Sequence, residues 1–516
     1  MDHCLKIVEI VDMICSHLDP PPHSWSLSSQ RKFRDLAAMA RTCKAFQHPA
    51  LDYLWRETTL EKLVLRCMPS DLWAVGTVLD VSETVKIIRQ LRPVRDSDWD
   101  CIRLYAPRVK TLYAGHGAGW PSSAEVLPIL AVSLPESLFD NLRRLTWQHK
   151  EDYFHHIRLF LHSTLTSIHF WLCSDASASL FPALTRKCPN LTEIFTPVRA
   201  GYPHDSVSLA DFICGFKSPE YLSVPSLDHD VLQHLAGQPT LRSLSMTSFS
   251  TVLTLPMNER RPFSGLRKLS LLYPKILAAT QFFGVCIDVP LREAEVTFSE
   301  FLTPAEFHDL FAAASGGVSH SSLTDLYIET QWDCYTSEDI SATNLVRPLS
   351  VRLLLDFANL TTLFIRTPIG FDLDNNIILD MARAWRQIQT LQMLGTHLTS
   401  PAELSCMSRV LCAKLPTFAT PLNRIRCNHQ RLDVEHSPIS APISIARFLS
   451  RIFPKIRIVQ THWEYHDDEE EEEEEELGAN DLRVQARWNE VKTLLPEVLA
   501  IREEEKALAR ELRRSS

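Results

Sequence analysis

A recurring pattern of apolar residues constrains the fold of this chain more than any other feature. Each copy has Leu, two mostly polar residues, Leu or Ile, one further residue and a third apolar residue. First positions at Leu142, Leu165, Leu191, Leu241, Leu266 and Leu291 are separated by 23, 26, 50, 25 and 25 residues. One copy arises easily by chance, but a regular period does not. The gap of 50 fits two repeats with Tyr221-Leu222 between them.

Leucine-rich repeats have this period, and each unit consists of a short strand and a returning segment. Further copies begin at Leu323, Leu360 and Ile388, with weaker ones at Val109 and Leu422. We therefore predict an α/β fold with a leucine-rich-repeat solenoid over residues 106–463, in which each unit buries its apolar positions against the next. The usual Asn or Cys after the third apolar position is mostly missing, so we expect an irregular solenoid. A stack of helical-pair repeats is the structural alternative.

Residues 1–58 predict a separate helical module. Residues 5–18 place apolar side chains at spacings of three and four, and the prolines of Asp19–Pro22 end this helix. A second helix is predicted over 31–44, and a third from Pro49 through Trp55. Three short helices bury little surface on their own, so such a module usually completes its core against a partner or the domain behind it.

The remaining segments differ in composition. We predict that residues 59–105 are a helical linker packing on the repeats. Residues 467–476 are ten consecutive carboxylates whose charges repel, so 464–479 is interpreted as a disordered acidic spacer. Residues 480–516 predict a C-terminal helix with an apolar side interrupted near Pro496.

Charge and cysteine usage limit the partners. The net charge is −10, and outside the acidic run 53 basic residues balance 53 acidic ones, so no basic field for nucleic acid is expected. No apolar stretch is long enough for a membrane span and no signal peptide is recognisable, so no membrane partner is expected. The 13 cysteines form no CxxC pair, which is typical of reduced thiols in the cytoplasm or nucleus.

Catalytic motifs are missing from the sequence. It contains no GxSxG, HExxH, GxxxxGK[ST] or GxGxxG, and only 14 glycines. Gly115–Gly119 (GHGAG) is interpreted as a return between repeats, with a phosphate cradle as the alternative. The pairs His155-His156 and His462/His466 are interpreted as exposed histidines, with a metal site as the alternative, and Cys4, Cys15 and Cys43 as core residues. We expect no catalytic residue, no metal and no cofactor.

The N-terminal residues resemble the F-box, a three-helix module. The resemblance runs through residues 5–10 (LKIVEI), the helix around Leu36, residues 43–46 (CKAF) and residues 49–56 (PALDYLWR). Residues 67–73 (CMPSDLW), 92–99 (RPVRDSDW) and 105–112 (YAPRVKTL) look like hallmarks of a large fungal group that places an F-box before divergent leucine-rich repeats. Many F-boxes carry Pro where this chain has Val8, which keeps a function without a ligase role open.

The resemblance implies a non-catalytic substrate receptor of a Skp1-cullin-F-box ubiquitin ligase. The F-box would dock on a Skp1-type adaptor, and through it a cullin, while the repeats bind an unknown protein substrate. The implied docking residues are Leu5, Val8, Ile10, Val11 and Ile14, supported by Leu36, Phe46, Leu54 and Trp55.

Two other functions remain open. One is a leucine-rich-repeat scaffold with no ligase role, and the other is an enzyme with a divergent site. An apolar seam on residues 5–18 open to solvent would favour the ligase, and a seam covered by the chain's own repeats would favour the scaffold. A deep polar pocket with converging His and carboxylate groups would favour the enzyme.

Overall fold

The computed structural model divides the chain into two compact units, Met1–Val224 and Pro225–Ser516, which are described separately. The residues that the structure describes are 7–18, 27–80, 83–115, 122–133, 138–149, 151–171, 180–196, 206–225, 227–247, 262–330, 345–367, 369, 371, 375–395, 431–433, 442–443, 446–447, 450, 458–460 and 479–515. Both units are mixed α/β structures in which the strands of the main sheet run parallel.

The first unit opens with three helices and continues with strands separated by short helices. Its elements are α1 (Val8–Leu18), α2 (Leu27–Ala40), α3 (Lys44–Leu54), β1 (Glu57–Thr59), α4 (Leu60–Cys67), β2 (Trp73–Asp80), β3 (Glu83–Gln90), η2 (Asp96–Trp99), α5 (Asp100–Tyr105), η3 (Ala106–Arg108), β4 (Thr111–Ala114), η4 (Ala124–Val126), α6 (Leu127–Ser133), β5 (Arg144–Trp147), η5 (Glu151–Phe160), β6 (Ser167–Phe170), α8 (Phe181–Lys187), β7 (Glu193–Phe195), α9 (Ser206–Cys214) and β8 (Tyr221–Val224).

The parallel sheet of the first unit begins earlier than the sequence predicted. Strand β1 pairs with β4, and β4 to β8 then follow in chain order, each pairing with the next. The sheet therefore starts at Glu57, within the segment assigned to the helical module, and not at residue 106. Three residues carry too little pattern to predict β1, which is defined by its pairing with a strand more than 50 residues away.

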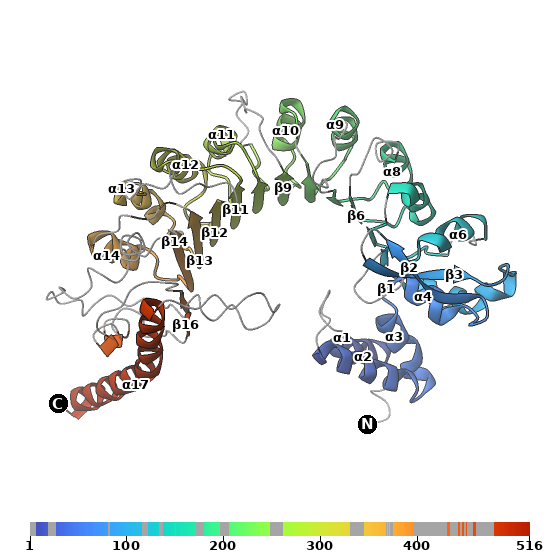
Figure 1. Cartoon of the computed structure of the whole chain (residues 1–516), viewed down its shortest axis with the longest axis horizontal. Helices are drawn as coiled ribbons and strands as arrows, with labels where there is room; N and C mark the ends of the chain where they lie inside the picture. The colour runs from blue at the N-terminus through green and yellow to red at the C-terminus, as the bar shows by residue number, and fades with distance from the viewer. Residues whose placement is uncertain are drawn as a thin grey trace. The chain divides into compact units, whose positions relative to one another are not determined.

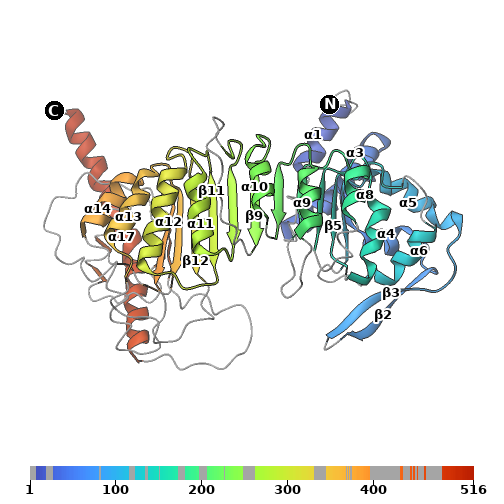
Figure 2. The same ribbon diagram turned by 90° about the horizontal axis from the view of Figure 1, so that it is seen from above.

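The prediction that residues 59–105 are a helical linker is wrong for residues 73–90. Strands β2 and β3 pair antiparallel in register from Trp73↔Gln90 to Asp80↔Glu83. Figure 2 shows this hairpin extending away from the helices of the first unit. Both strands are rich in Val, Ile and Thr, which favour extended structure because their branched side chains are crowded in a helix.

The second unit repeats one strand and one returning segment. Its elements are α10 (His229–Ala236), β9 (Ser243–Thr247), β10 (Lys268–Leu272), α11 (Ile276–Val285), β11 (Glu293–Phe298), α12 (Pro304–Gly317), β12 (Asp325–Thr330), α13 (Pro348–Arg352), η6 (Leu353–Asp356), β13 (Thr362–Thr367), α14 (Asn375–Ala384), β14 (Thr390–Gly395), β15 (Arg431–Asp433), β16 (Ile458–Gln460) and α17 (Ala479–Ser515). Strands β9 to β16 pair parallel in chain order.

The apolar triplets mark strands, as predicted. Leu145 and Trp147 lie in β5, and Leu326 and Ile328 lie in β12. The repeat inferred inside the gap of 50 residues is strand β8, which begins at Tyr221. The weak copy beginning at Val109 leads into β4, whereas the weak copy at Leu422 lies outside the described residues.

Equivalent positions of successive repeats stack because the register is constant. In the second unit Leu244, Leu269, Ala294, Leu326 and Leu363 are partners across neighbouring strands, and each is at most 2% exposed. Apolar side chains of one repeat thus cover those of the next, which is the burial that the periodic Leu positions predict.

Backbone hydrogen bonds also link successive repeats just before their strands. Two successive amides donate to one carbonyl of the preceding repeat: Arg292 N and Glu293 N reach Arg267 O at 2.7 and 3.0 Å, and Thr324 N and Asp325 N reach Arg292 O, both at 2.9 Å. These bonds satisfy polar groups that the close stacking of repeats would otherwise bury unpaired.

Asparagines placed directly before the first Leu of three repeats add a side-chain link. Asn141, Asn190 and Asn359 donate through Nδ2 to a carbonyl oxygen of the preceding repeat at 2.8, 2.8 and 2.7 Å. The polar residue expected from the sequence would follow the triplet, so this Asn before the first Leu was not predicted. The recurring pair Asn-Leu in FDNL, CPNL and FANL was the available signal.

Helices cover one side of the second unit's sheet. Figure 1 shows α10 to α14 on one side of strands β9 to β14, and the opposite face of β10 to β13 carries no helix among the described residues. We call this uncovered side of β10 to β13 the strand face.

The ends of the predicted helices are partly corrected. Helix α2 begins at Leu27 and not at residue 31, and α3 begins at Lys44, so Pro49 lies inside it and not at its start. The predicted C-terminal helix is confirmed as α17, which runs through Pro496. The acidic residues 467–476 lie outside the described residues.

Candidate functional site

The N-terminal helices α1, α2 and α3 surround a small core. Val11 and Cys15 from α1, Leu36 from α2 and Ala50 from α3 are at most 1% exposed. Val11 and Cys15 are four residues apart, so they lie on one side of the helix and reach the core together. Leu18, Met39, Ala40, Phe46, Tyr53 and Leu54 pack around them.

The other sides of α1 and the residue before it expose apolar side chains. Val8 is 65% exposed, Met13 55%, Ile7 45% and Ile14 36%. We call these four residues the α1 face. Single exposed apolar residues are common on proteins, but these four lie within eight residues and leave more than one side of α1 apolar and open to solvent, which is typical of interaction sites.

The predicted docking residues fall into two groups. Val8 and Ile14 are exposed, and Ile10 is half-buried. Val11 and Leu36 are buried in the module core and support α1 from within, and the partly buried Phe46 and Leu54 pack against them. Leu5 lies outside the described residues.

Two exposed members of the α1 face were missing from the prediction. Ile7 and Met13 are apolar but do not follow the stripe of Val8, Val11 and Ile14. An eleven-residue helix that is apolar on more than one side was the available signal, because one side suffices for the core.

Trp55, the ninth predicted residue, joins the helical module to the segment that follows it. Its ring stacks on Tyr105 with centroids 4.5 Å apart, and Lys62 Nζ lies 5.4 Å from its centroid. Arg108 adds polar links to α3, since it pairs with the Asp52 carboxylate and donates to the His48 carbonyl oxygen at 3.3 Å. These contacts position α3, and with it the module core, against the rest of the first unit.

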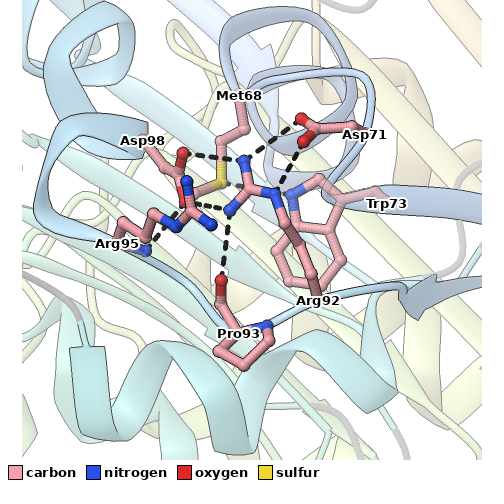
Figure 3. A network of polar contacts seen from close by, with 7 residues as sticks. All are labelled: Met68, Asp71, Trp73, Arg92, Pro93, Arg95 and Asp98. Carbon is pink, nitrogen blue, oxygen red and sulfur yellow. Dashed lines mark hydrogen bonds and ion pairs between the residues drawn. The ribbon is translucent and has the colours of Figure 1, made fainter.

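Arg92 forms the polar centre that anchors the base of the β2–β3 hairpin, as Figure 3 shows. Its Nε and Nη2 donate to Asp71 at 2.7 and 3.1 Å, and its Nη1 and Nη2 donate to Asp98 at 2.7 and 2.9 Å. Nη1 also donates to Pro93 O at 3.1 Å. The guanidinium therefore binds two carboxylates from opposite sides, a geometry that its planar fork allows.

Pairing with Arg92 lowers the pKa of both carboxylates. Hydrogen bonds from Arg92 and from the Arg95 amide lower the pKa of Asp98 to about 2, and Asp98 is nearly inaccessible. The pKa of the more exposed Asp71 is lowered chiefly by the hydrogen bonds from Arg92 and further by the charge of that guanidinium, while partial burial opposes the shift. Asp98 therefore stays ionised and holds the start of η2 beside the hairpin.

A second polar group consists of Glu61 of α4, Ser123 and His149, all of which are buried. Glu61 Oε1 accepts from the Ser123 hydroxyl and from Gly115 N at 3.2 Å, and Ser123 Oγ lies 3.1 Å from His149 Nε2. When Glu61 is ionised, Ser123 donates its single proton to Glu61, and the Ser123 oxygen can then accept from the His149 ring. Burial raises the pKa of Glu61.

This group differs from a catalytic triad in its order. In a triad the imidazole lies between the nucleophile and the carboxylate, whereas here the hydroxyl of Ser123 lies between the other two. Ser123 and Glu61 are both 0% exposed, so the hydroxyl is closed to a substrate. The arrangement joins α4 to the segments after β4 and β5 and is structural.

Gly115 explains the start of the glycine-rich segment. Its φ is +128°, and a Cβ there would lie 2.7 Å from the Gln148 carbonyl carbon, so only glycine fits where β4 ends against the neighbouring repeat. Residues 116–119 of the segment lie outside the described residues.

The remaining predicted positions show no metal cluster. His155 is exposed as predicted, but the prediction is wrong for His156, which is buried and whose pKa is lowered by that burial. The two ring centroids are 3.9 Å apart. His462 and His466 lie outside the described residues, within which no three His, Cys, Asp or Glu side chains are grouped to hold a metal. Cys15 is buried as predicted, but Cys43 is exposed, because it precedes α3 in the turn after α2.

Comparison with known proteins adds no assignment. No protein-family model matches the chain, and no curated protein is significantly similar to it. Within the described part of the chain, every helix is too short or too polar to cross a bilayer. The α1 face is thus the candidate functional site, because it combines exposed apolar side chains with a rigidly supported helix.

Proposed function

We propose that this chain is the substrate receptor of a Skp1-cullin-F-box ubiquitin ligase. In this proposal α1 to α3 form an F-box-like module that docks on a Skp1-type adaptor, and the parallel repeats form an irregular leucine-rich-repeat solenoid that binds a protein substrate. The chain itself carries out no chemistry. It raises the effective concentration of the substrate near the ubiquitin that the partner subunits transfer.

The observation that carries the proposal is the α1 face. Val8 and Met13 are more than half exposed, although the module buries other α1 residues to below 2%. A marginal three-helix module that leaves apolar side chains in water gains stability when a partner covers them. The resemblance to the F-box selects a Skp1-type adaptor as that partner.

The alternative is a leucine-rich-repeat scaffold that binds proteins without ubiquitin transfer. The resemblance is compatible with it, because Val8 stands where many F-boxes carry proline. The two functions differ in a single property, the affinity of the α1 face for the adaptor.

Co-expression with a Skp1-type adaptor, followed by affinity purification, tests the proposal. The variant Val8→Asp plus Ile14→Asp places two charges on the α1 face and leaves the module core intact. Its matched control is Leu277→Asp plus Leu349→Asp, which charges two residues of the second unit that are 59% and 66% exposed. Val11 is unsuitable, because a charge at this buried position would unfold the module.

We expect the adaptor to co-purify with the intact chain and the control, and to be lost from the Val8/Ile14 variant, while circular dichroism shows all three folded. If the intact, folded chain does not bind the adaptor, the ligase function is rejected and the scaffold is retained.

A further inference from the structure

The strand face of the second unit is built from side chains at alternate strand positions. Along β11 and β12 partly exposed residues alternate with buried ones. Because side chains of a strand point to opposite faces in turn, the partly exposed residues are the ones on the strand face. Register groups the outward residues of β10 to β13 into three rows: Lys268, Glu293, Asp325 and Thr362; Ser270, Glu295, Tyr327 and Phe364; and Leu272, Thr297, Glu329 and Arg366.

Two of the four carboxylates on this face are neutralised by cations of the same face. Lys268 Nζ lies 2.6 Å from Glu293 Oε1, and Arg366 Nη1 lies 3.4 Å from Glu329 Oε1. Both pairs are partly exposed and join neighbouring strands, and each pair is neutral in itself.

The other two carboxylates pair with hydroxyls. Glu295 Oε2 accepts from Ser270 Oγ at 3.1 Å, and Asp325 accepts from Thr324 Oγ1 at 2.7 Å and Thr361 Oγ1 at 3.3 Å. No Lys or Arg pairs with Glu295 or Asp325 among the residues that the structure describes. The strand face therefore carries two uncompensated negative charges on adjacent strands, Asp325 in the first row and Glu295 in the middle row.

An aromatic pair adjoins these charges. Tyr327 and Phe364 are direct partners on β12 and β13, with ring centroids 6.2 Å apart. Burial, Asp325, Glu293 and Glu295 all raise the pKa of Tyr327, which shows that the carboxylates create a negative potential at this ring. Aromatic rings and carboxylates together attract cations, since a cation can contact the ring face and the carboxylate at once.

The strands on either side of β10 to β13, namely β9 and β14, have no charged residue at the equivalent register positions. Strand β9 presents Ser243, Ser245 and Thr247 at the equivalent positions, so the negative centre is a local feature and not a property of the whole sheet. Phosphate groups would be repelled by it, which argues against a nucleic acid as the occupant.

We propose that the strand face binds a lysine- or arginine-bearing extended segment of a partner protein, with a cationic side chain between Glu295 and Asp325 and its stem against Tyr327 and Phe364. This inference rests on the proposed function and names its substrate class. The charge complementarity commits the face to a basic protein segment.

Fluorescence anisotropy of labelled peptides on the full chain tests this assignment. The probe is a short, unstructured peptide of alternating lysine and serine, and its counterpart carries glutamate in place of lysine. The test variant is Glu295→Gln plus Asp325→Asn, which removes both charges but keeps an acceptor for each hydroxyl. The matched control is Asp309→Asn, which removes a charge from the exposed side of α12.

We expect the lysine peptide to bind and the glutamate peptide not to bind. The double variant should bind the lysine peptide about ten-fold more weakly, since each exposed ion pair contributes up to about five-fold. Added salt should weaken binding to the intact chain more than binding to the double variant. The Asp309→Asn control should match the intact chain.

Equal binding of the lysine peptide by the intact chain and the double variant would overturn the assignment, as would no binding at all. Sedimentation showing that the intact chain self-associates and the double variant does not would also overturn it, because a second copy would then be the occupant. None of these outcomes depends on the adaptor, so failure here is separate from failure of the ligase proposal.

Discussion

Gly317 shows how closely successive repeats approach at the scale of a single residue. A Cβ at this position in α12 would lie 1.9 Å from the carbonyl oxygen of Phe283 in α11, whereas a Cβ at the adjacent Gly316 would meet nothing within 4 Å. Two neighbouring glycines of one helix therefore occupy opposite environments, one pressed against backbone and one open to solvent.

We expect Gly317→Ala to destabilise the second unit by about 1–3 kcal/mol, because the helices must separate to admit the methyl group. Gly316→Ala should be neutral or stabilising by up to about 1 kcal/mol, because alanine favours a helix more than glycine does. Urea unfolding followed by circular dichroism measures both variants. Equal responses would show that α11 and α12 are not packed as described.

Glu61 gives a pH dependence whose sign follows from its burial. Burial raises its pKa above the ordinary value of 4.5, and the hydrogen bonds from Ser123 and Gly115 oppose this only in part. The folded chain then holds the proton more tightly than the unfolded chain does. The stability that this provides is fully present below pH 4.5 and is lost as the pH rises through the folded pKa.

We therefore expect Glu61→Gln to lose less stability than the intact chain as the pH is raised from 4.5 to neutrality, because glutamine keeps an acceptor for Ser123 and has no charge to bury. The difference between the urea midpoints of the two proteins across this range is the measurement. A constant difference would mean that Glu61 does not titrate within it.

At the scale of an element, the β2–β3 hairpin depends on one side chain. Arg92 uses its Nε and both Nη atoms on Asp71, Asp98 and Pro93 O, and a lysine has neither the fork nor the reach to repeat this. We expect Arg92→Lys to lower the melting temperature and to speed amide exchange in residues 73–90. Arg89→Lys, at an exposed position of β3, is the control and should change neither. Equal exchange in both variants would contradict the anchoring role.

Some strands were predictable from the sequence and others were not, and the reason lies in how each strand is stabilised. The triplets of β5, β12 and β13 were predictable because a constant register buries the same positions in these repeats. Strand β1 was not, because its pairing is decided by a strand more than 50 residues away. The hairpin was missed although its two strands are adjacent in the sequence and rich in Val, Ile and Thr. The Glu61–Ser123–His149 group also joins residues far apart in the chain, so no local pattern marked it.

The candidate site was predictable only to the level of its helix. The apolar spacing of residues 5–18 located α1, but it did not separate Val11, which is buried, from Val8, which is exposed. Both are apolar valines on a helix that is apolar on several sides. The distinction comes from the packing of Leu36 and Ala50 against one side of α1, which is a tertiary property.

At the scale of the whole molecule, the two units have different proposed tasks. The first unit supports the α1 face through a small helical core and the contacts of Trp55 and Arg108. The second unit presents the strand face, with uncompensated charges at Glu295 and Asp325. Above all, we propose that the α1 face binds a Skp1-type adaptor, because only that contact would make the chain a ligase subunit.

Hydrogen exchange measured by mass spectrometry on the full chain, with and without a Skp1-type adaptor, tests this claim most directly. We expect the adaptor to slow amide exchange in α1, Val8–Leu18, and to leave exchange in strands β10 to β13 unchanged. No complex, or protection confined to β10 to β13 with α1 unaffected, would contradict it.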